Sequence, residues 1–270
     1  MIFTGERYLP TNFNKSSLEH VHRYAFSLHF TKDKIVVDIA CGTGYGTYMI
    51  SENAKHVTGI DISKETIDYA NKHYNRKNLK FVVGNIIKIP LPSNSVDVVI
   101  SFETIEHHDK HLEMILEIKR VLKKEGILII STPDKINYSI IPKYNNKFHV
   151  KELTTKDFYL LMRTHFAYIK DLYQKVNYCS LITTSESSNF IEFDGQYNEI
   201  SLNKQMVSPI YNIAIVSDYE INEPVFSSSF NGDLVLHNLL NVGNITFCQF
   251  IIAKLYRLGS IVKSIFKKYK

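Results

Sequence analysis

The sequence predicts an α/β fold, in which helices cover both faces of a seven-stranded, mostly parallel sheet with an antiparallel edge strand. Two patterns predict it. From residue 35 onwards, short apolar runs alternate with segments of helical periodicity, and this alternation is typical of parallel sheets. The first apolar run, residues 35–39, also leads directly into a glycine-rich turn at residues 40–46. A strand that enters such a turn is typical of a nucleotide pocket.

Length and composition favour one catalytic domain. The 270 residues are 44% hydrophobic, which is enough for one sizeable core with a small appendage. Cys41, Cys179 and Cys248 are too scattered for a disulfide framework and favour a reducing compartment. A signal peptide and an apolar window of membrane-spanning length are both missing from the sequence pattern. We therefore expect a cytoplasmic protein.

The first 34 residues are expected to form a helical cap, because apolar residues recur at helical spacing between residues 18 and 28. Arg23 and Tyr24 would then stand near the mouth of the pocket. A guanidinium can bind a carboxylate through two parallel hydrogen bonds, so Arg23 is a candidate for a ligand carboxylate. A solvated surface arginine is the alternative.

The glycine spacing in the turn argues against a dinucleotide, and so against an NAD-dependent oxidoreductase. A dinucleotide site needs a third glycine three positions after the second, and that position is Thr47 here, because Gly42, Gly44 and Gly46 alternate. Asp38, inside the preceding strand, would repel a diphosphate and attract a cation. S-adenosylmethionine carries an ammonium and a sulfonium group, and glycines in the turn would let it approach the backbone.

Four further apolar runs follow in the order that this fold requires, at residues 56–61, 80–85, 95–101 and 126–133. The first of them ends in Asp61, within the usual distance of the turn at which a carboxylate accepts hydrogen bonds from a ribose diol. Asn85 ends the next run, and Phe102 and Glu103 follow the third. Polar groups at successive strand ends are expected to meet at one edge of the sheet.

The segments between these runs are predicted to be helices. Ser63 is expected to cap the helix that begins at Lys64, and Asp109 the helix that Gly126 ends. A later helix is expected to begin near residues 154–157.

Residues 168–174 and 211–217 are expected to form an antiparallel pair that finishes the sheet. The span 178–208 between them is rich in Ser, Thr and Asn and shows little periodicity. It is too long for a plain hairpin loop, so we interpret it as an insertion over the pocket or a lid.

Residues 35–133 resemble the class I S-adenosylmethionine-dependent methyltransferases, because five motifs stand in the right order. The resemblance implies a Rossmann-like domain over residues 35–232 with S-adenosyl-L-methionine as cofactor. We interpret Cys41 as a small side chain in a crowded turn rather than as a nucleophile. The implied cofactor-binding residues are Arg23, Tyr24, Asp38, Ala40, Cys41, Gly42, Gly44, Asp61, Ile62, Asn85, Ile86, Phe102 and Glu103.

Flanking segments resemble a narrower group. Residues 4–8 (Thr-Gly-Glu-Arg-Tyr), 19–26 and 146–152, together with the Tyr173-Gln174-Lys175 segment, look like bacterial methyltransferases encoded among glycosyltransferases for surface polysaccharides. This resemblance implies O-methylation in polysaccharide biosynthesis. The expected acceptor is a hydroxyl of a sugar, nucleotide-sugar or glycan.

Histidines are the candidate bases. A sugar hydroxyl is a poor nucleophile until its proton leaves, and an imidazole titrates near neutral pH. His107, at the end of the fourth run, lies where this fold places residues that face the transferred methyl group. His149 would approach from the acceptor side. A supporting or helix-capping role is the alternative for His107.

Acidic and histidine residues crowd the segment 103–111, which raises the alternative of a metal ion. His107 and His111 are one helical turn apart, and this spacing suits two ligands. The segment straddles a strand-to-helix corner, however, so we predict an ordinary polar helix start and no resident metal. The residues concerned are Glu103, Glu106, His107, His108, Asp109 and His111.

Residues 233–270 are expected to form a basic, amphipathic helical tail, because no acidic residue follows Asp233. Such a helix can lie on the anionic inner face of a membrane. Packing on the domain, or on the second subunit of a homodimer, is the alternative.

Two other functions stay open. One is the methylation of a quinone-like or other small metabolite. The motifs around residues 102–107 are also similar to those of enzymes with such acceptors, and the apolar tail suits an apolar acceptor. A non-catalytic methyltransferase-like partner in glycan assembly is the third alternative. Nucleic acid is not an expected partner, because an Asn-Pro-Pro-aromatic motif is missing and the basic tail is short.

Overall fold

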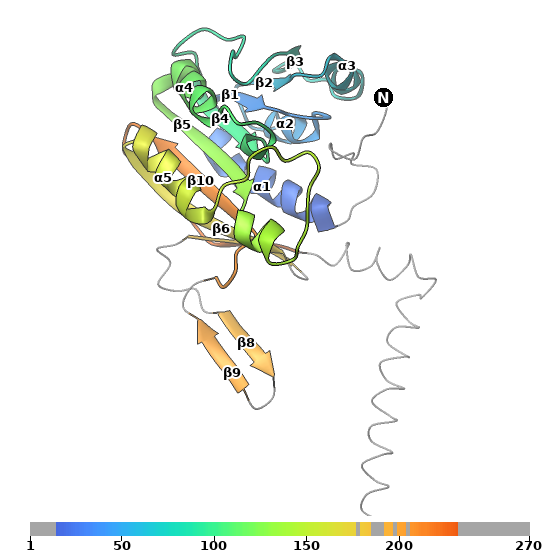
Figure 1. Ribbon diagram of the computed structural model, residues 1–270. Coiled ribbons are helices and arrows are strands. Elements are labelled where there is room, and N and C mark those ends of the chain that lie inside the picture. Colours follow the sequence, from blue (N-terminus) through green and yellow to red (C-terminus); the bar gives the residue numbers. More distant parts are fainter. Residues whose placement is uncertain (1–14, 177–178, 185–191, 197–198, 204–205, 232–270) are drawn as a thin grey trace, which may run out of the picture.

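The computed structural model describes residues 15–176, 179–184, 192–196, 199–203 and 206–231. These residues form a nine-stranded sheet, with strand order β11-β7-β6-β10-β5-β4-β1-β2-β3, and helices around it (Figure 1). The strands of this sheet are β1 (Ile35–Ile39), β2 (His56–Asp61), β3 (Leu79–Val83), β4 (Val96–Phe102), β5 (Leu122–Pro133), β6 (Tyr168–Val176), β7 (Cys179–Thr184), β10 (Tyr211–Ser217) and β11 (Ser228–Asn231). The helices are α1 (Lys15–Thr31), α2 (Tyr45–Ile50), α3 (Lys64–His73), α4 (His111–Val121) and α5 (Thr155–His165), with short helical turns at Ile105–His107 and Lys135–Ile140.

Strands β1 to β5 are parallel, and β10 runs antiparallel between β5 and β6. The predicted fold class is therefore confirmed, including antiparallel strands toward one edge. The sheet has two strands more than the seven predicted, because β7 and β11 extend it beyond β6.

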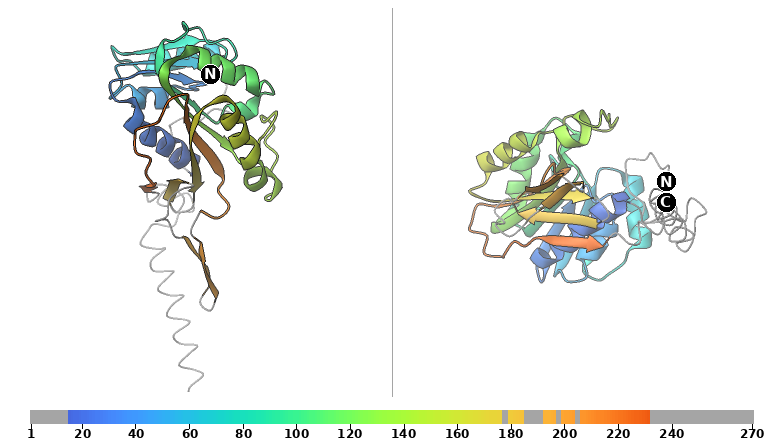
Figure 2. Two further views of the ribbon diagram at one scale, coloured as in Figure 1. Left: turned by 90° about the vertical axis from the view of Figure 1, so that its left-hand side faces the viewer. Right: turned by 90° about the horizontal axis from the view of Figure 1, so that it is seen from below.

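Alternating side chains of the strands build two cores, one on each face of the sheet. Val37 and Ile39 pack with α4 and α5, whereas Val36 packs with α1 and α2. Figure 2 shows these helix pairs on opposite sides of the sheet. The period-2 pattern of the buried strands thus requires helices on both faces.

Two of the three predicted helix starts are correct. The side chain of Ser63 accepts a hydrogen bond from the N–H of Thr66, and Thr154 accepts one from Asp157. The prediction for α4 was wrong at both ends. Its N-cap is Lys110 rather than Asp109, and it ends at Val121, because the chain enters β5 directly and pairs with β4 there.

The span 178–208 was predicted to be an insertion over the pocket or a lid, and the parts of it that the structure describes are mostly strands. Residues 179–184 are β7, which pairs with β6 in the main sheet. Strands β8 (Glu192–Gln196) and β9 (Glu199–Asn203) form a separate two-stranded sheet that projects away from the domain in Figure 1. The Ser- and Thr-rich composition hid strand β7, because its burial depends on the distant strands β6 and β11.

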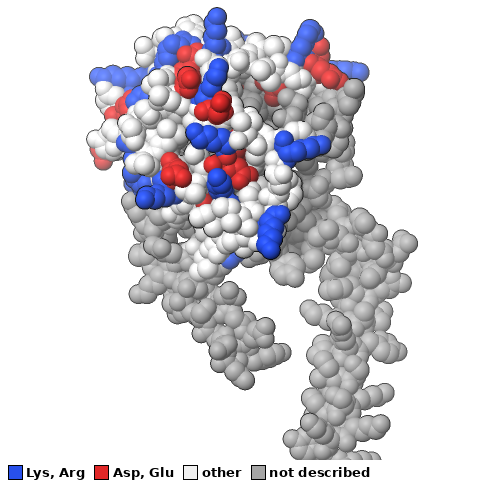
Figure 3. Space-filling model, viewed as in Figure 1, with Lys and Arg blue, Asp and Glu red and all other residues white. Residues whose placement is uncertain are grey.

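Residues 1–14 and the tail 233–270, including the motif at 4–8, lie outside the described residues. Among the helices that are described, each is too short or too polar to span a bilayer. On the face seen in Figure 3, Lys and Arg side chains are interspersed with Asp and Glu.

Candidate active site

A pocket of about 790 Å³ opens at the carboxyl ends of the parallel strands. The helices that follow β1 and β4 pack on opposite faces of the sheet, so the pocket lies at the topological switch point, where ligands of such sheets bind. Its wall is formed by Glu19, His20, Tyr24, Ala40, Cys41, Gly42, Thr43, Tyr45, Asp61, Ile62, Asn85, Ile86, Ile87, Phe102, Glu103, Thr104, Glu106, His107, His108, Asp109, Lys110, Tyr138, Tyr144, Asn146, Phe148, His149 and Tyr211.

Each of the two central strands, β1 and β4, is followed by a residue in the left-handed backbone conformation. Ala40 follows β1 with φ 56°, and Glu103 follows β4 with φ 51°. Such a conformation costs a residue with a side chain about 1–3 kcal/mol and clusters at ligand sites. These two turns direct the segments that follow β1 and β4 around the pocket.

The three glycines of the turn have three different roles. Gly42 has φ +53°, and a Cβ atom there would meet nothing within 4 Å, so it borders open pocket space. Gly44 has φ +87°, and its Cβ would lie 2.7 Å from the Phe81 ring. A Cβ on Gly46 would lie 2.0 Å from the ring of Tyr24. Gly42 therefore serves the pocket, whereas Gly44 and Gly46 permit close packing.

Asp61 ends β2 with its carboxylate in the pocket wall. One oxygen accepts a hydrogen bond from Gly42 N–H at 3.1 Å, and the other from Ser63 N–H at 2.9 Å. A carboxylate has about four acceptor sites, and this one lies in the pocket wall, where a ligand hydroxyl can reach it. Next to it the apolar side chain of Ile62 is 67% exposed, and a flat apolar ligand ring would cover it.

Asp38 lies behind the glycine turn rather than in the pocket wall. Its buried carboxylate accepts hydrogen bonds from Thr47 Oγ1 at 2.6 Å and from the Tyr24 hydroxyl at 3.2 Å. Burial raises the pKa of Asp38 to about 7, although both hydrogen bonds oppose this rise. Asp38 therefore ties α1 and α2 to β1. Burial also raises the pKa of the Cys41 thiol, which stays neutral.

Arg23 is a buried counter-ion. Its side chain is 1% exposed, Nη1 donates to Gln174 Oε1 at 2.8 Å, and the same atom lies 3.5 Å from Glu103 Oε1. Glu103 also accepts a hydrogen bond from Ser131 Oγ at 2.6 Å. The guanidinium therefore fixes Glu103, which does line the pocket.

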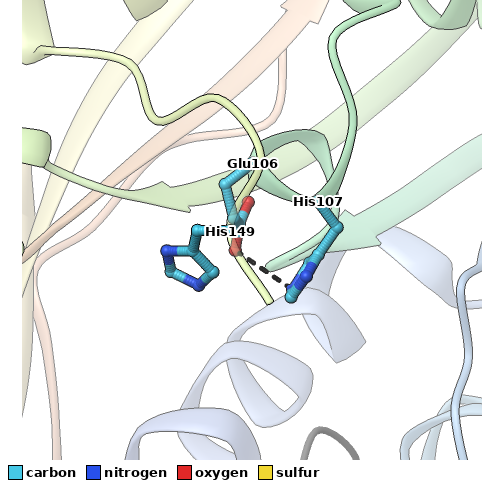
Figure 4. A group of neighbouring side chains, drawn as sticks. All are labelled: Glu106, His107 and His149. Carbon is cyan, nitrogen blue, oxygen red and sulfur yellow. Dashed lines mark ion pairs between the residues drawn. The ribbon is translucent and has the colours of Figure 1, made fainter. Parts of the chain in front are cut away.

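Glu106, His107 and His149 meet at the other end of the pocket (Figure 4). Glu106 is 1% exposed; Thr132 Oγ1 donates to its Oε2 at 3.0 Å, and its Oε1 lies 3.9 Å from His107 Nε2. The rings of His107 and His149 meet edge to face, with centroids 5.1 Å apart. Burial, together with the nearby Glu103, raises the pKa of Glu106 well above its usual range.

Comparison with known proteins agrees with this geometry. The family model described as a methyltransferase domain matches residues 37–130. A protein of Mycolicibacterium smegmatis, named as a probable S-adenosylmethionine-dependent methyltransferase, is 32% identical over 166 residues, which cover 60% of this chain and 63% of that protein. A demethylmenaquinone methyltransferase of Lactococcus lactis is 30% identical over 122 residues, or 43% of this chain and 47% of that protein. The chain therefore spans less than two thirds of the length of either relative.

Among solved structures, a SAM-dependent methyltransferase from Thermotoga maritima covers 75% of this chain and 90% of its own, with a TM-score of 0.54 and 17% identity. At this identity the likeness shows the fold alone. Residues 37–130 carry the methyltransferase-domain match, and the fold around them is that of class I S-adenosylmethionine-dependent methyltransferases.

The pocket of the methyltransferase domain fits the cofactor predicted from the sequence. Gly42 leaves space at the backbone, Asp61 places a carboxylate in the wall where a diol would lie, and Ile62 offers an exposed apolar surface. When bound there, S-adenosylmethionine supplies an electrophilic methyl group. Of the predicted cofactor residues, those in the wall are Tyr24, Ala40, Cys41, Gly42, Asp61, Ile62, Asn85, Ile86, Phe102 and Glu103.

Three predicted cofactor residues are not in the wall of the methyltransferase pocket. Arg23 faces Glu103 and Gln174, Asp38 faces Tyr24 and Thr47, and Gly44 packs against Phe81. Their carboxylate-binding, cation-attracting and backbone-approach roles are therefore corrected to structural ones. Burial explains all three differences, since sequence spacing does not reveal which polar group is enclosed by others.

Both predicted catalytic histidines, His107 and His149, do line the pocket. His111, which the metal alternative paired with His107, has its Nε2 2.8 Å from the carbonyl oxygen of His108. Sequence reasoning missed several wall residues, namely Glu19, Tyr45, Tyr138, Tyr144 and Tyr211. A local signal for them is missing, because helices, strands and loops that are far apart in sequence bring them together.

Proposed function

We propose that this chain transfers a methyl group from S-adenosylmethionine to a hydroxyl oxygen of a sugar or glycan. The observation that carries the proposal is the polar acceptor end of the pocket. Glu106, His107 and His149 lie there beside Tyr138 and Asn146. An apolar acceptor would take these groups away from water without offering hydrogen bonds, which is unfavourable. A polyhydroxylated acceptor would supply both donors and acceptors.

The chain's part in the reaction is mostly orientation. Methyl transfer is an in-line displacement, in which the new carbon–oxygen bond forms as the carbon–sulfur bond breaks, and the electron pair stays on sulfur. The acceptor hydroxyl must lose its proton to become a strong nucleophile. The group of Glu106, His107 and His149 would hold this hydroxyl and assist the loss of its proton.

The biological setting proposed here is surface-polysaccharide biosynthesis, on the resemblance of the segments at 19–26 and 146–152. Relatives point to other acceptors as well, since they include quinone, sterol and fatty-acid methyltransferases by name. A quinone-like acceptor is the second candidate, because the carbonyl oxygens at the edge of a quinone ring could bind at the same polar end.

Methyl transfer from labelled S-adenosylmethionine tests the proposal. Purified full-length protein would be incubated with three acceptor panels: saccharides and nucleotide-sugars, a demethylated quinone in detergent, and a fatty acid. We expect label in a saccharide, with the label lost in Asp61→Asn and kept in the matched surface variant Asp68→Asn. Label in the quinone or fatty acid alone, or in none of the panels, would contradict the proposal.

A further inference from the structure

We propose that Glu106, His107 and His149 bind a divalent first-row transition-metal ion at the acceptor end of the pocket. The ion would in turn hold a hydroxyl of the acceptor, and this second part rests on the proposed function. The three residues come from the corner after β4 and from the loop after β5, which are more than forty residues apart in sequence (Figure 4).

The distances suit a shared cation. Each residue offers one ligand atom, and these atoms all lie within 4.8 Å of one another; Glu106 Oε1 and His107 Nε2 are 3.9 Å apart. An ion with bonds of about 2.0–2.2 Å holds its ligand atoms roughly 3–3.5 Å apart. Binding would therefore need side-chain movements of about 1 Å and leave the backbone in place.

The carboxylate of Glu106 provides independent support. It is 1% exposed, its Oε2 already accepts from Thr132, and its Oε1 is buried without a hydrogen-bond partner among the described residues. A buried carboxylate oxygen without a partner is unfavourable. It is directed at His107 in Figure 4, and a cation between them would satisfy it.

Both imidazoles are held as metal ligands usually are. His107 Nδ1 lies 3.0 Å from the carbonyl oxygen of Phe148, and His149 Nδ1 lies 2.5 Å from Glu152 Oε1. Such acceptors keep the proton on Nδ1 and direct the Nε2 lone pair at the metal. Asn146 Nδ2, which lies 2.9 Å from His149 Nε2, would have to give way to the ion.

The ligand set indicates the class of ion. Two imidazoles and one carboxylate suit Zn²⁺, Fe²⁺ or Co²⁺ better than Mg²⁺ or Ca²⁺, which prefer oxygen ligands. A hydroxyl bound to such an ion loses its proton to water more easily. The two histidines would then act as ligands, and the base role expected from the sequence would be unnecessary.

Cobalt titration of the full-length, chelator-treated protein tests the site without relying on activity. Co²⁺ reports its ligands through visible absorption, and we expect one saturable Co²⁺ per chain. Glu106→Gln, His107→Gln and His149→Gln should each weaken binding at least tenfold. His73→Gln, on the exposed surface of α3, controls for surface histidines, and His111→Gln tests the alternative pairing.

Several results would overturn the site. They are the lack of saturable Co²⁺ binding in the wild-type protein, unchanged binding in His107→Gln and His149→Gln, and a loss in His111→Gln equal to theirs. Circular dichroism would confirm that each variant is folded, and the wild-type titration decides the question if a variant is not. Cobalt binding without methyl transfer to any acceptor would leave the metal site standing and refute the proposed function. Methyl transfer without metal binding would do the reverse.

Discussion

The ring of Tyr24 occupies the space that a side chain on residue 46 would need. A Cβ atom on Gly46 would lie 2.0 Å from Cζ of the ring. The hydroxyl of the same tyrosine reaches Asp38 in β1. One aromatic side chain of α1 therefore lies on the glycine turn, lines the pocket and satisfies a buried carboxylate. Helix α1 thus forms part of the pocket wall.

Replacing Gly46 with alanine should destabilise the domain. The added methyl group collides with the Tyr24 ring, and overpacking of this kind costs about 1–3 kcal/mol. Urea denaturation would measure the change in the free energy of unfolding. In a Tyr24→Ala background the same replacement should cost much less. Equal losses in both backgrounds would show that the ring is not the obstacle.

Gly42→Ala should weaken cofactor binding more than it weakens folding. The new methyl group meets nothing within 4 Å and points into the pocket, while φ +53° adds backbone strain of about 1 kcal/mol. Calorimetric titration with S-adenosylhomocysteine, alongside urea denaturation, would separate the two effects. The interpretation fails if affinity is unchanged while stability falls.

The stability of the protein should depend on pH through Asp38. Its pKa is about 7 in the folded state, above the ordinary value of 3.8, so the folded protein keeps a proton that the unfolded chain has lost. This contribution is fully present below about pH 4 and disappears as pH rises to about 7, with a total on the order of 4 kcal/mol.

Asp38→Asn should remove this dependence. Between pH 4 and pH 7 the free energy of unfolding of the wild-type protein should fall relative to that of the variant. Urea denaturation at a series of pH values would measure the difference. Parallel curves for the two proteins would contradict the assignment.

Replacing Arg23 with methionine should affect stability more than cofactor affinity. The substitution leaves Glu103 and Gln174 without their cationic partner, and breaking a buried pair costs about 3–5 kcal/mol. The double variant Arg23→Met, Glu103→Gln should recover part of the loss. A large drop in affinity for S-adenosylhomocysteine at unchanged stability would instead support direct contact between Arg23 and the cofactor.

Local patterns predicted much of the fold for a physical reason. In the buried strands β1, β4 and β5, apolar runs followed by polar or glycine residues mark both the strand and its pocket end. The backbone geometry of a strand itself determines that successive side chains point to opposite faces of the sheet. The strand-end residues Asp61 and Phe102 were therefore placed correctly at the pocket.

Other features depend on contacts between distant segments, and a single sequence does not reveal them. Strand β7 forms because β6 and β11 are beside it. Arg23 is buried because Gln174, 151 residues later, accepts its hydrogen bond. His149 joins His107 through the fold of the loop after β5, so sequence spacing favoured His111 as the neighbour instead.

The central claim is that the turn at Gly42 and the carboxylate of Asp61 form an S-adenosylmethionine site. Calorimetric titration of the full-length protein with S-adenosylhomocysteine tests it most directly. We predict saturable binding of one molecule per chain, weakened about tenfold or more in Asp61→Asn, since a hydrogen bond to a charged group contributes about 1.5–3 kcal/mol. The control Asp68→Asn should bind like the wild-type protein. Undetectable binding to the wild-type protein, or equal affinity in Asp61→Asn, would contradict the claim.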